Sequence, residues 1–241
     1  MNRKTPFPET LYFHFLIDDM VTSFEITLSP KDNMKTLTKR RRMYPLKLSK
    51  IYKDKPWGGR EFIKLFPNLP AGDANIGESW EASVYTGALS VIENGLYSGM
   101  HLSDLVELHP EIVFAKTENL NTLFPLLIKF LDIHDRLSIQ VHPDDTYAKT
   151  HENESGKTES WYILKASPDA KIILGMSGES TREQFLRNAA ANNFRDMFRT
   201  VSVKEGDLIN IAPGTVHGTL EGSVVLYEIQ QNSDLTYRIY D

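Results

Sequence analysis

The chain has 241 residues, no cysteine and a formal net charge of −5 at neutral pH. This length is sufficient for one substantial hydrophobic core, and no apolar segment is long enough for a transmembrane helix. The absence of cysteine excludes disulfide bonds and suits a reducing compartment, so we expect a cytoplasmic protein without a membrane partner.

The first 43 residues differ in charge from the rest of the chain. They carry a net charge of +3, whereas residues 44–241 carry −8. The apolar run 11–17 contains His14 and has no small-residue cleavage site, which argues against a signal peptide. The basic run 39–42 does not recur, which favours solvated charge over a nucleic-acid surface. We expect residues 1–43 to be an N-terminal extension, either disordered or the product of a misassigned start, and residues 44–241 to form the folded domain.

Short apolar segments between residues 44 and 133 predict a mixture of strands and helix. The segments 46–52, 79–85 and 88–93 are typical of strands. Two further apolar segments, 102–108 and 123–130, are compatible with either type of element.

From residue 137 onward the pattern predicts mostly strands, with one helix at 181–191. Ser180 or Thr181 is the expected N-cap of this helix, with Glu183 in its first turn. Many short strands separated by glycine and proline turns are typical of a β-barrel or jelly roll. The predicted fold class is therefore mainly β, a barrel or jelly roll with a few helices.

The segment 137–142 places two potential metal ligands on one face of a predicted strand. Its residues alternate between apolar and polar, so Gln140 and His142 lie on the polar face. They are about 6.6–6.8 Å apart along the strand, close enough to converge on one ion. The alternative is a buried histidine that is hydrogen-bonded to its neighbours.

Two later segments add ligands of the same kind. Lys157 and Glu159 share a face where a turn enters a predicted strand. His217 follows a Pro-Gly turn, and the glycine after it leaves room for a group to approach the imidazole. One amide oxygen, one carboxylate and two imidazoles suit a divalent metal such as zinc. A structural zinc site is the alternative, but such sites are usually rich in cysteine.

Other polar residues have simpler interpretations. Asp144 and Asp145 follow a proline and are expected to cap a helix. Glu78 and Glu81 flank Trp80 in a predicted strand, where we expect them to line a site or to serve the structure. The remaining histidines are expected to be surface or packing residues: His14, His101, His109, His134 and His151.

The motifs together resemble a known enzyme family. The chain is similar to the short bacterial form of type I mannose-6-phosphate isomerase, a zinc enzyme of the cupin superfamily, from about residue 44 to the last residue. The resemblance is carried by residues 55–59, 77–81, 140–145, 156–159, 212–218 and 234–241.

The resemblance implies a site and a cofactor. His142, Glu159 and His217 would be metal ligands for one zinc ion per chain, and Gln140 stands where longer relatives have a glutamine ligand. Arg238 matches an arginine regarded as catalytic, and Lys157 matches a lysine of the sugar-phosphate pocket.

The resemblance also implies a function and leaves alternatives. The implied activity interconverts mannose 6-phosphate and fructose 6-phosphate by proton transfer between C1 and C2 through a cis-enediol, with Lys157 as base or as phosphate anchor. The family continues into a second β-domain after the arginine strand, so we expect that domain to be absent. A non-catalytic cupin that senses a sugar phosphate and an iron-dependent cupin oxygenase are the alternatives. The oligomeric state is not predicted.

Overall fold

The structure, a computed structural model, describes residues 10–17, 20–27, 44–66, 69, 75–114, 124–178, 180–191, 193–194 and 197–240. The chain divides into two compact units, one from residues 1–49 and 89–123 and the other from residues 50–88 and 124–241. In the described parts, no helix is long and apolar enough to cross a membrane.

The first unit combines a hairpin with short helices. Its elements are β1 (Thr10–Ile17), β2 (Met20–Thr27), η1 (Gly95–Tyr97), α3 (Leu102–Leu108) and α4 (Pro110–Val113). Strands β1 and β2 pair antiparallel. Ile92, Tyr97 and Leu105 form a small buried cluster. Of the expected extension 1–43, only β1 and β2 are described, and its assignment as an extension stays a prediction.

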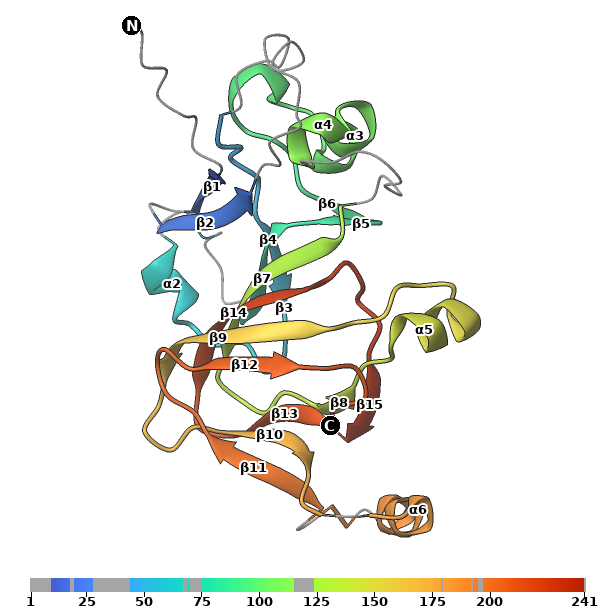
Figure 1. The fold of residues 1–241 in the computed structure, drawn as a ribbon. Helices are drawn as coiled ribbons and strands as arrows, with labels where there is room; N and C mark the ends of the chain where they lie inside the picture. Colours follow the sequence, from blue (N-terminus) through green and yellow to red (C-terminus); the bar gives the residue numbers. More distant parts are fainter. Residues whose placement is uncertain are drawn as a thin grey trace, which may run out of the picture. The chain divides into compact units, whose positions relative to one another are not determined.

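The second unit contains two antiparallel sheets. The six-stranded sheet has the order β12-β9-β14-β7-β4-β3, and the five-stranded sheet has the order β11-β10-β13-β8-β15 (Figure 1). The strands of the first sheet are β3 (Ile51–Asp54), β4 (Ile76–Ala82), β7 (Leu126–Ile133), β9 (Glu159–Ala166), β12 (Leu208–Ile211) and β14 (Val224–Gln231). The strands of the second are β8 (Ile139–Val141), β10 (Lys171–Met176), β11 (Phe198–Ser202), β13 (His217–Glu221) and β15 (Tyr237–Tyr240).

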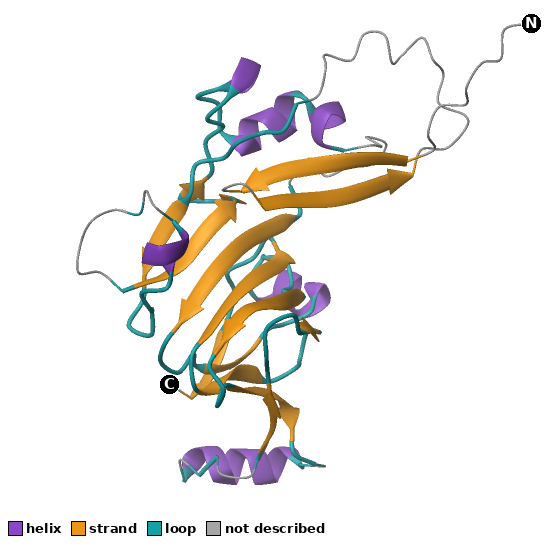
Figure 2. Ribbon diagram, turned by 90° about the vertical axis from the view of Figure 1, so that its left-hand side faces the viewer, coloured by secondary structure: helices purple, strands orange, loops and turns teal. Residues whose placement is uncertain are grey.

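Short elements complete this architecture. They are the helices α2 (Phe62–Leu65), α5 (Asp145–His151) and α6 (Arg182–Ala190) and the small sheet of β5 (Val84–Tyr85) and β6 (Ala88–Leu89). Strands therefore dominate, as Figure 2 shows, and the predicted mainly β fold is confirmed.

The hydrophobic core lies between the two sheets of the second unit. Trp161, Ile163 and Leu226 of the six-stranded sheet pack with Ile172 of the five-stranded sheet. Full burial of each such side chain contributes about 1.5–3 kcal/mol. On the outer face of the five-stranded sheet, a second apolar cluster includes Ile173 and Phe198. Both faces of the five-stranded sheet are therefore apolar over much of their area. Buried polar side chains such as Gln140 and His217 stand out against this apolar background.

Most predicted elements appear, with shifts at their ends. The uncertain segments resolve into helix α3 and strand β7. Helix α6 begins after Thr181, which forms a capping box with Gln184, as the cap prediction required. Of the strand predicted at 46–52, only the end forms β3. The residues before it lie beside Val91, which accepts a hydrogen bond from Ser49 N at 2.7 Å.

Candidate metal centre

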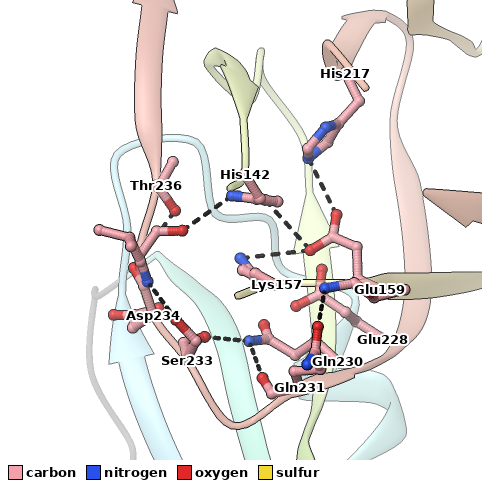
Figure 3. Close-up of polar contacts among 12 residues, drawn as sticks. His142, Lys157, Glu159, His217, Glu228, Gln230, Gln231, Ser233, Asp234 and Thr236 are labelled. Carbon is pink, nitrogen blue, oxygen red and sulfur yellow. Dashed lines mark hydrogen bonds and ion pairs between the residues drawn. The ribbon is translucent and has the colours of Figure 1, made fainter. Parts of the chain in front are cut away.

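Three side chains from distant parts of the sequence meet inside the second unit. His142 follows β8, Glu159 begins β9 and His217 begins β13, and all three are buried. His142 Nε2 lies 3.4 Å from Glu159 Oε2, and His217 Nε2 lies 3.1 Å from Glu159 Oε1 (Figure 3). The convergence expected from the sequence is therefore present.

The backbone fixes how both imidazoles face the cluster. His142 Nδ1 lies 3.0 Å from the Leu235 carbonyl oxygen, and His217 Nδ1 lies 2.9 Å from that of Thr215. A carbonyl oxygen only accepts, so each Nδ1 carries a proton and each Nε2 faces Glu159. This is the arrangement in which histidine binds metals.

The cluster satisfies a simple test for a metal site. Both Nε2 atoms and both carboxylate oxygens of Glu159 are buried and have no hydrogen-bond partner among the described residues. One candidate ligand atom from each residue can be chosen within 4.8 Å of the others. Tetrahedral zinc, with bonds of about 2.0–2.2 Å, places its ligand atoms about 3.3–3.6 Å apart. The separations of 3.4 Å from His142 Nε2 to Glu159 Oε2 and 3.1 Å from His217 Nε2 to Glu159 Oε1 are close to this spacing, so the three side chains are placed to hold a metal ion.

Electrostatics favour the ligand forms of these residues. Burial lowers the pKa of His142 to about 4, so the ring is neutral at physiological pH. Burial alone would raise the pKa of Glu159, but the charge of Lys157 outweighs burial and holds it well below its usual range. Lys157 is itself buried, and its Nζ lies 3.4 Å from Glu159 Oε2. The site thus presents an ionised carboxylate beside the neutral imidazole of His142 and the imidazole of His217.

The two remaining predicted site residues share a row with His217. Gln140 is paired with His217 on β13 and with Arg238 on β15. Residues paired in this way project from the same face of a sheet. Gln140 is buried and Arg238 is exposed. Their roles as ligand and catalytic group stay predictions.

The structure changes two details of the sequence interpretation. Alternation along residues 235–240 predicts Tyr240 on the same face as Arg238, but a β-bulge after Arg238 pairs Tyr240 with Ile139, and Tyr240 packs on Phe194. A Cβ at Gly218 would lie 2.7 Å from the Ser138 carbonyl oxygen. This glycine is therefore required for close approach of β8 to β13.

The sequence did not predict a buried charge cluster next to the metal site. Lys129 of β7 is only 3% exposed and lies 3.7 Å from Glu228 Oε1 and 3.9 Å from Glu78 Oε2. Glu228 accepts a hydrogen bond from Trp161 Nε1 at 2.8 Å, and the Trp161 ring packs edge-on against His217. The lysine within the apolar run 126–133 was the signal that could have found this cluster.

The pKa values in the charge cluster reflect burial and mutual attraction. Burial would lower the pKa of Lys129, but Glu228, Glu78 and Asp234 outweigh it and raise the pKa. Burial and the charge of Glu159 raise the pKa of Glu228. Burial would also raise the pKa of Glu78, but the charges of Lys129 and Lys55 outweigh it and lower that pKa. Lys129 is therefore a buried cation that opposes the cost of burying Glu78 and Glu228.

We expect Lys129→Met to lower the free energy of unfolding by about 3–5 kcal/mol, because it leaves buried carboxylates without their cation. Chemical denaturation followed by circular dichroism measures this loss. Lys165→Met is the matched control, because Lys165 forms an exposed ion pair with Glu61 at 2.6 Å and should contribute less than about 1 kcal/mol. Equal losses in the two variants would contradict the prediction.

The other polar residues behave largely as expected. Asp144 caps α5 by accepting a hydrogen bond from Tyr147 N at 2.7 Å. In the described part of the chain, His142, Glu159 and His217 are the only group of three such side chains close enough to hold a metal. No other histidine there joins a group of this kind.

Comparison with known proteins identifies related sequences. Residues 45–171 match the family model described as phosphomannose isomerase type I, catalytic domain. The chain is 41% identical over 199 residues to a probable mannose-6-phosphate isomerase, GmuF, of Bacillus subtilis, covering 82% of this chain and 61% of the relative. It is 40% identical over 198 residues to a mannose-6-phosphate isomerase of Streptococcus mutans, covering 82% and 60%.

Solved structures of mannose-6-phosphate isomerases also resemble this chain. The mannose 6-phosphate isomerase of Bacillus subtilis matches with a TM-score of 0.75 and 36% identity over 81% of this chain and 61% of that one. A putative mannosephosphate isomerase of Archaeoglobus fulgidus matches with a TM-score of 0.68 and 25% identity, over 81% and 63%. The chain spans about three fifths of the length of the curated relatives it matches.

Proposed function

Because the chain belongs to the type I phosphomannose isomerase family, with its cupin fold, we propose that it interconverts mannose 6-phosphate and fructose 6-phosphate with one zinc ion per chain. The names of its relatives support this substrate. The observation that carries the proposal is the buried group of four ligand atoms on His142, Glu159 and His217 that have no hydrogen-bond partner among the described residues.

The proposed metal ligands are His142, Glu159 and His217, with Gln140 as the fourth. Gln140 supports this role by its burial and by its position opposite His217. Zinc would supply Lewis-acid stabilisation of the negative charge that develops on the sugar oxygens during enolisation. Zinc is redox-inert, which suits a proton transfer.

Lys157 is the proposed group that moves the proton between C1 and C2. Its Nζ is buried within 3.4 Å of a Glu159 oxygen, so its amino group lies where the reacting carbons would approach the metal ligands, and the unprotonated amine could take the proton. A base must lie within hydrogen-bond reach of the proton that it takes. The phosphate lies at the far end of the sugar, away from these carbons. This position therefore favours proton transfer over phosphate anchoring for Lys157.

Arg238 is the proposed phosphate ligand. It is exposed, and it projects from the same face of the sheet as Gln140. A planar guanidinium can bind two phosphate oxygens at once. An exposed cation in this row could receive the phosphate end of a sugar whose other end lies against the metal ligands. Arg238 would then orient the substrate.

Turnover by the purified chain tests the proposed function. We expect the zinc-loaded chain to convert mannose 6-phosphate in a coupled assay and to incorporate deuterium at C2 in deuterated water. Removal of the metal by a chelator should abolish both signals, and added zinc should restore them. Tight binding of the sugar phosphate without exchange would favour the non-catalytic sensor instead. Oxygen uptake with bound iron would favour the oxygenase.

A further inference from the structure

The side-chain amide of Gln230 is held firmly inside the second unit. Gln230 lies near the end of β14 and is 1% exposed. Its Nε2 donates to the Ser233 carbonyl oxygen and, at 3.0 Å, to the Gln231 carbonyl oxygen. An amide NH₂ has two hydrogens, so both are used.

These two contacts also determine where the amide oxygen points. Reversing the amide would press Oε1 against two carbonyl oxygens, which cannot donate a hydrogen bond. Oε1 therefore faces the other way, as Figure 3 shows for the labelled Gln230. This oxygen is buried and has no hydrogen-bond donor among the described residues. A buried acceptor without a donor is costly, so a donor is expected from a bound molecule.

The unpartnered oxygen belongs to a residue directly opposite a proposed metal ligand. Gln230 is paired with Glu159 in the antiparallel ladder of β14 and β9. Paired residues have Cβ atoms about 4.5–5.5 Å apart and share a face of the sheet. The loop that the Gln230 amide holds also supplies the Leu235 carbonyl oxygen to His142. Gln230 is thus part of the wall around the metal ligands, although it is not in the predicted ligand set.

We propose that Gln230 Oε1 accepts a hydrogen bond from a non-reacting hydroxyl of the bound sugar phosphate, and that Gln230 is a specificity-determining residue. This inference rests on the proposed function. An amide oxygen can only accept a hydrogen bond, and the hydroxyl of a sugar can donate one. The metal ligands hold the reacting end of the sugar, so C3 and C4 carry the nearest hydroxyls that take no part in the reaction. Gln230 would therefore favour a sugar phosphate that has a hydroxyl at C3 or C4 over the analogue that lacks this hydroxyl.

Deoxy analogues of the substrate test this role. The kcat/KM of zinc-loaded wild-type chain and of Gln230→Met is measured with mannose 6-phosphate and with its 3-deoxy and 4-deoxy analogues. We expect one analogue to react about 10-fold more slowly than mannose 6-phosphate in the wild type, because it leaves Oε1 unpaired. In Gln230→Met, this preference should shrink to less than about 2-fold, because the acceptor is gone.

The ratio of the kcat/KM values for two substrates distinguishes recognition of a hydroxyl by Gln230 from a purely structural role. Gln230→Met also removes the two bonds to the loop, but that loss lowers kcat/KM for all three substrates alike. Gln231→Met is the matched control, since Gln231 bonds to Thr158 N and Asp145 outside the metal cluster and should leave the ratio unchanged.

Two results would overturn the inference. If the wild type turns over all three sugars but Gln230→Met keeps the same preference among them, Gln230 does not read a hydroxyl and the proposed function stands. If calorimetry and the assay show that the wild type neither binds nor converts mannose 6-phosphate, the proposed function fails and this inference fails with it.

Discussion

A Glu159→Gln variant is expected to bind zinc at least about 100-fold more weakly than the wild-type chain. Glu159 is the negatively charged member of the cluster, and both of its oxygens face imidazole nitrogens at 3.1–3.4 Å. Glutamine keeps the shape but removes the charge, including the negative partner of the Lys157 ion pair. Turnover of mannose 6-phosphate should fall with metal content. Chelator competition and elemental analysis of the dialysed protein measure the loss.

The control for this variant is another buried carboxylate. Glu81 is buried in β4, where it pairs with Lys50 at 3.1 Å and accepts a hydrogen bond from Ser79, outside the metal cluster. Glu81→Gln should therefore retain one zinc ion per chain, even if it lowers stability. Retention of zinc by Glu159→Gln with unchanged affinity would rule out Glu159 as a ligand and remove the main support for the proposed function.

A Lys157→Met variant is expected to lower kcat by about 10²–10⁴-fold while KM for mannose 6-phosphate changes little. The physical reason is the position of Lys157, which is buried beside Glu159 and therefore near the reacting carbons. Removing a group that transfers the proton affects the chemical step more than binding. Steady-state kinetics and deuterium exchange at C2 measure the effect, with zinc content determined for each preparation.

Arg238→Lys gives the matched comparison. If Arg238 binds the phosphate with a planar fork, its replacement by lysine should raise KM more than it lowers kcat. Lys171→Met serves as a neutral control, because Lys171 forms an exposed ion pair with Glu221 at 2.6 Å. A Lys157→Met variant with normal kcat and raised KM would assign phosphate anchoring to Lys157 instead.

The fold could be read from the sequence where local pattern and tertiary environment agree. Thr181 and Gln184 encode the start of α6 within four residues, so the capping box was predictable. The segment 102–108 was ambiguous because a short apolar run fits a buried helix or a strand equally well. The strand predicted at 46–52 is mostly replaced by pairing with residues 91–94, which local sequence does not reveal.

The candidate site shows the same division. His142, Glu159 and His217 were found because motifs and family resemblance mark them one by one. Lys129, Glu228 and Gln230 were missed because each lies in a strand whose pattern indicates only packing, and their importance comes from neighbours on other strands. Register between strands, which local sequence does not encode, decides which of these polar side chains face one another.

The sequence by itself determined the mainly β class, the helix caps and the chemical types of the candidate metal ligands, because these depend on residues close together in the chain. Only the tertiary structure decided that Nδ1 of each imidazole faces a backbone carbonyl, that Lys129 is buried among carboxylates, and that Gln230 lies opposite Glu159. These features depend on strand pairing across tens of residues, where burial makes each unpaired charge or hydrogen-bonding group costly.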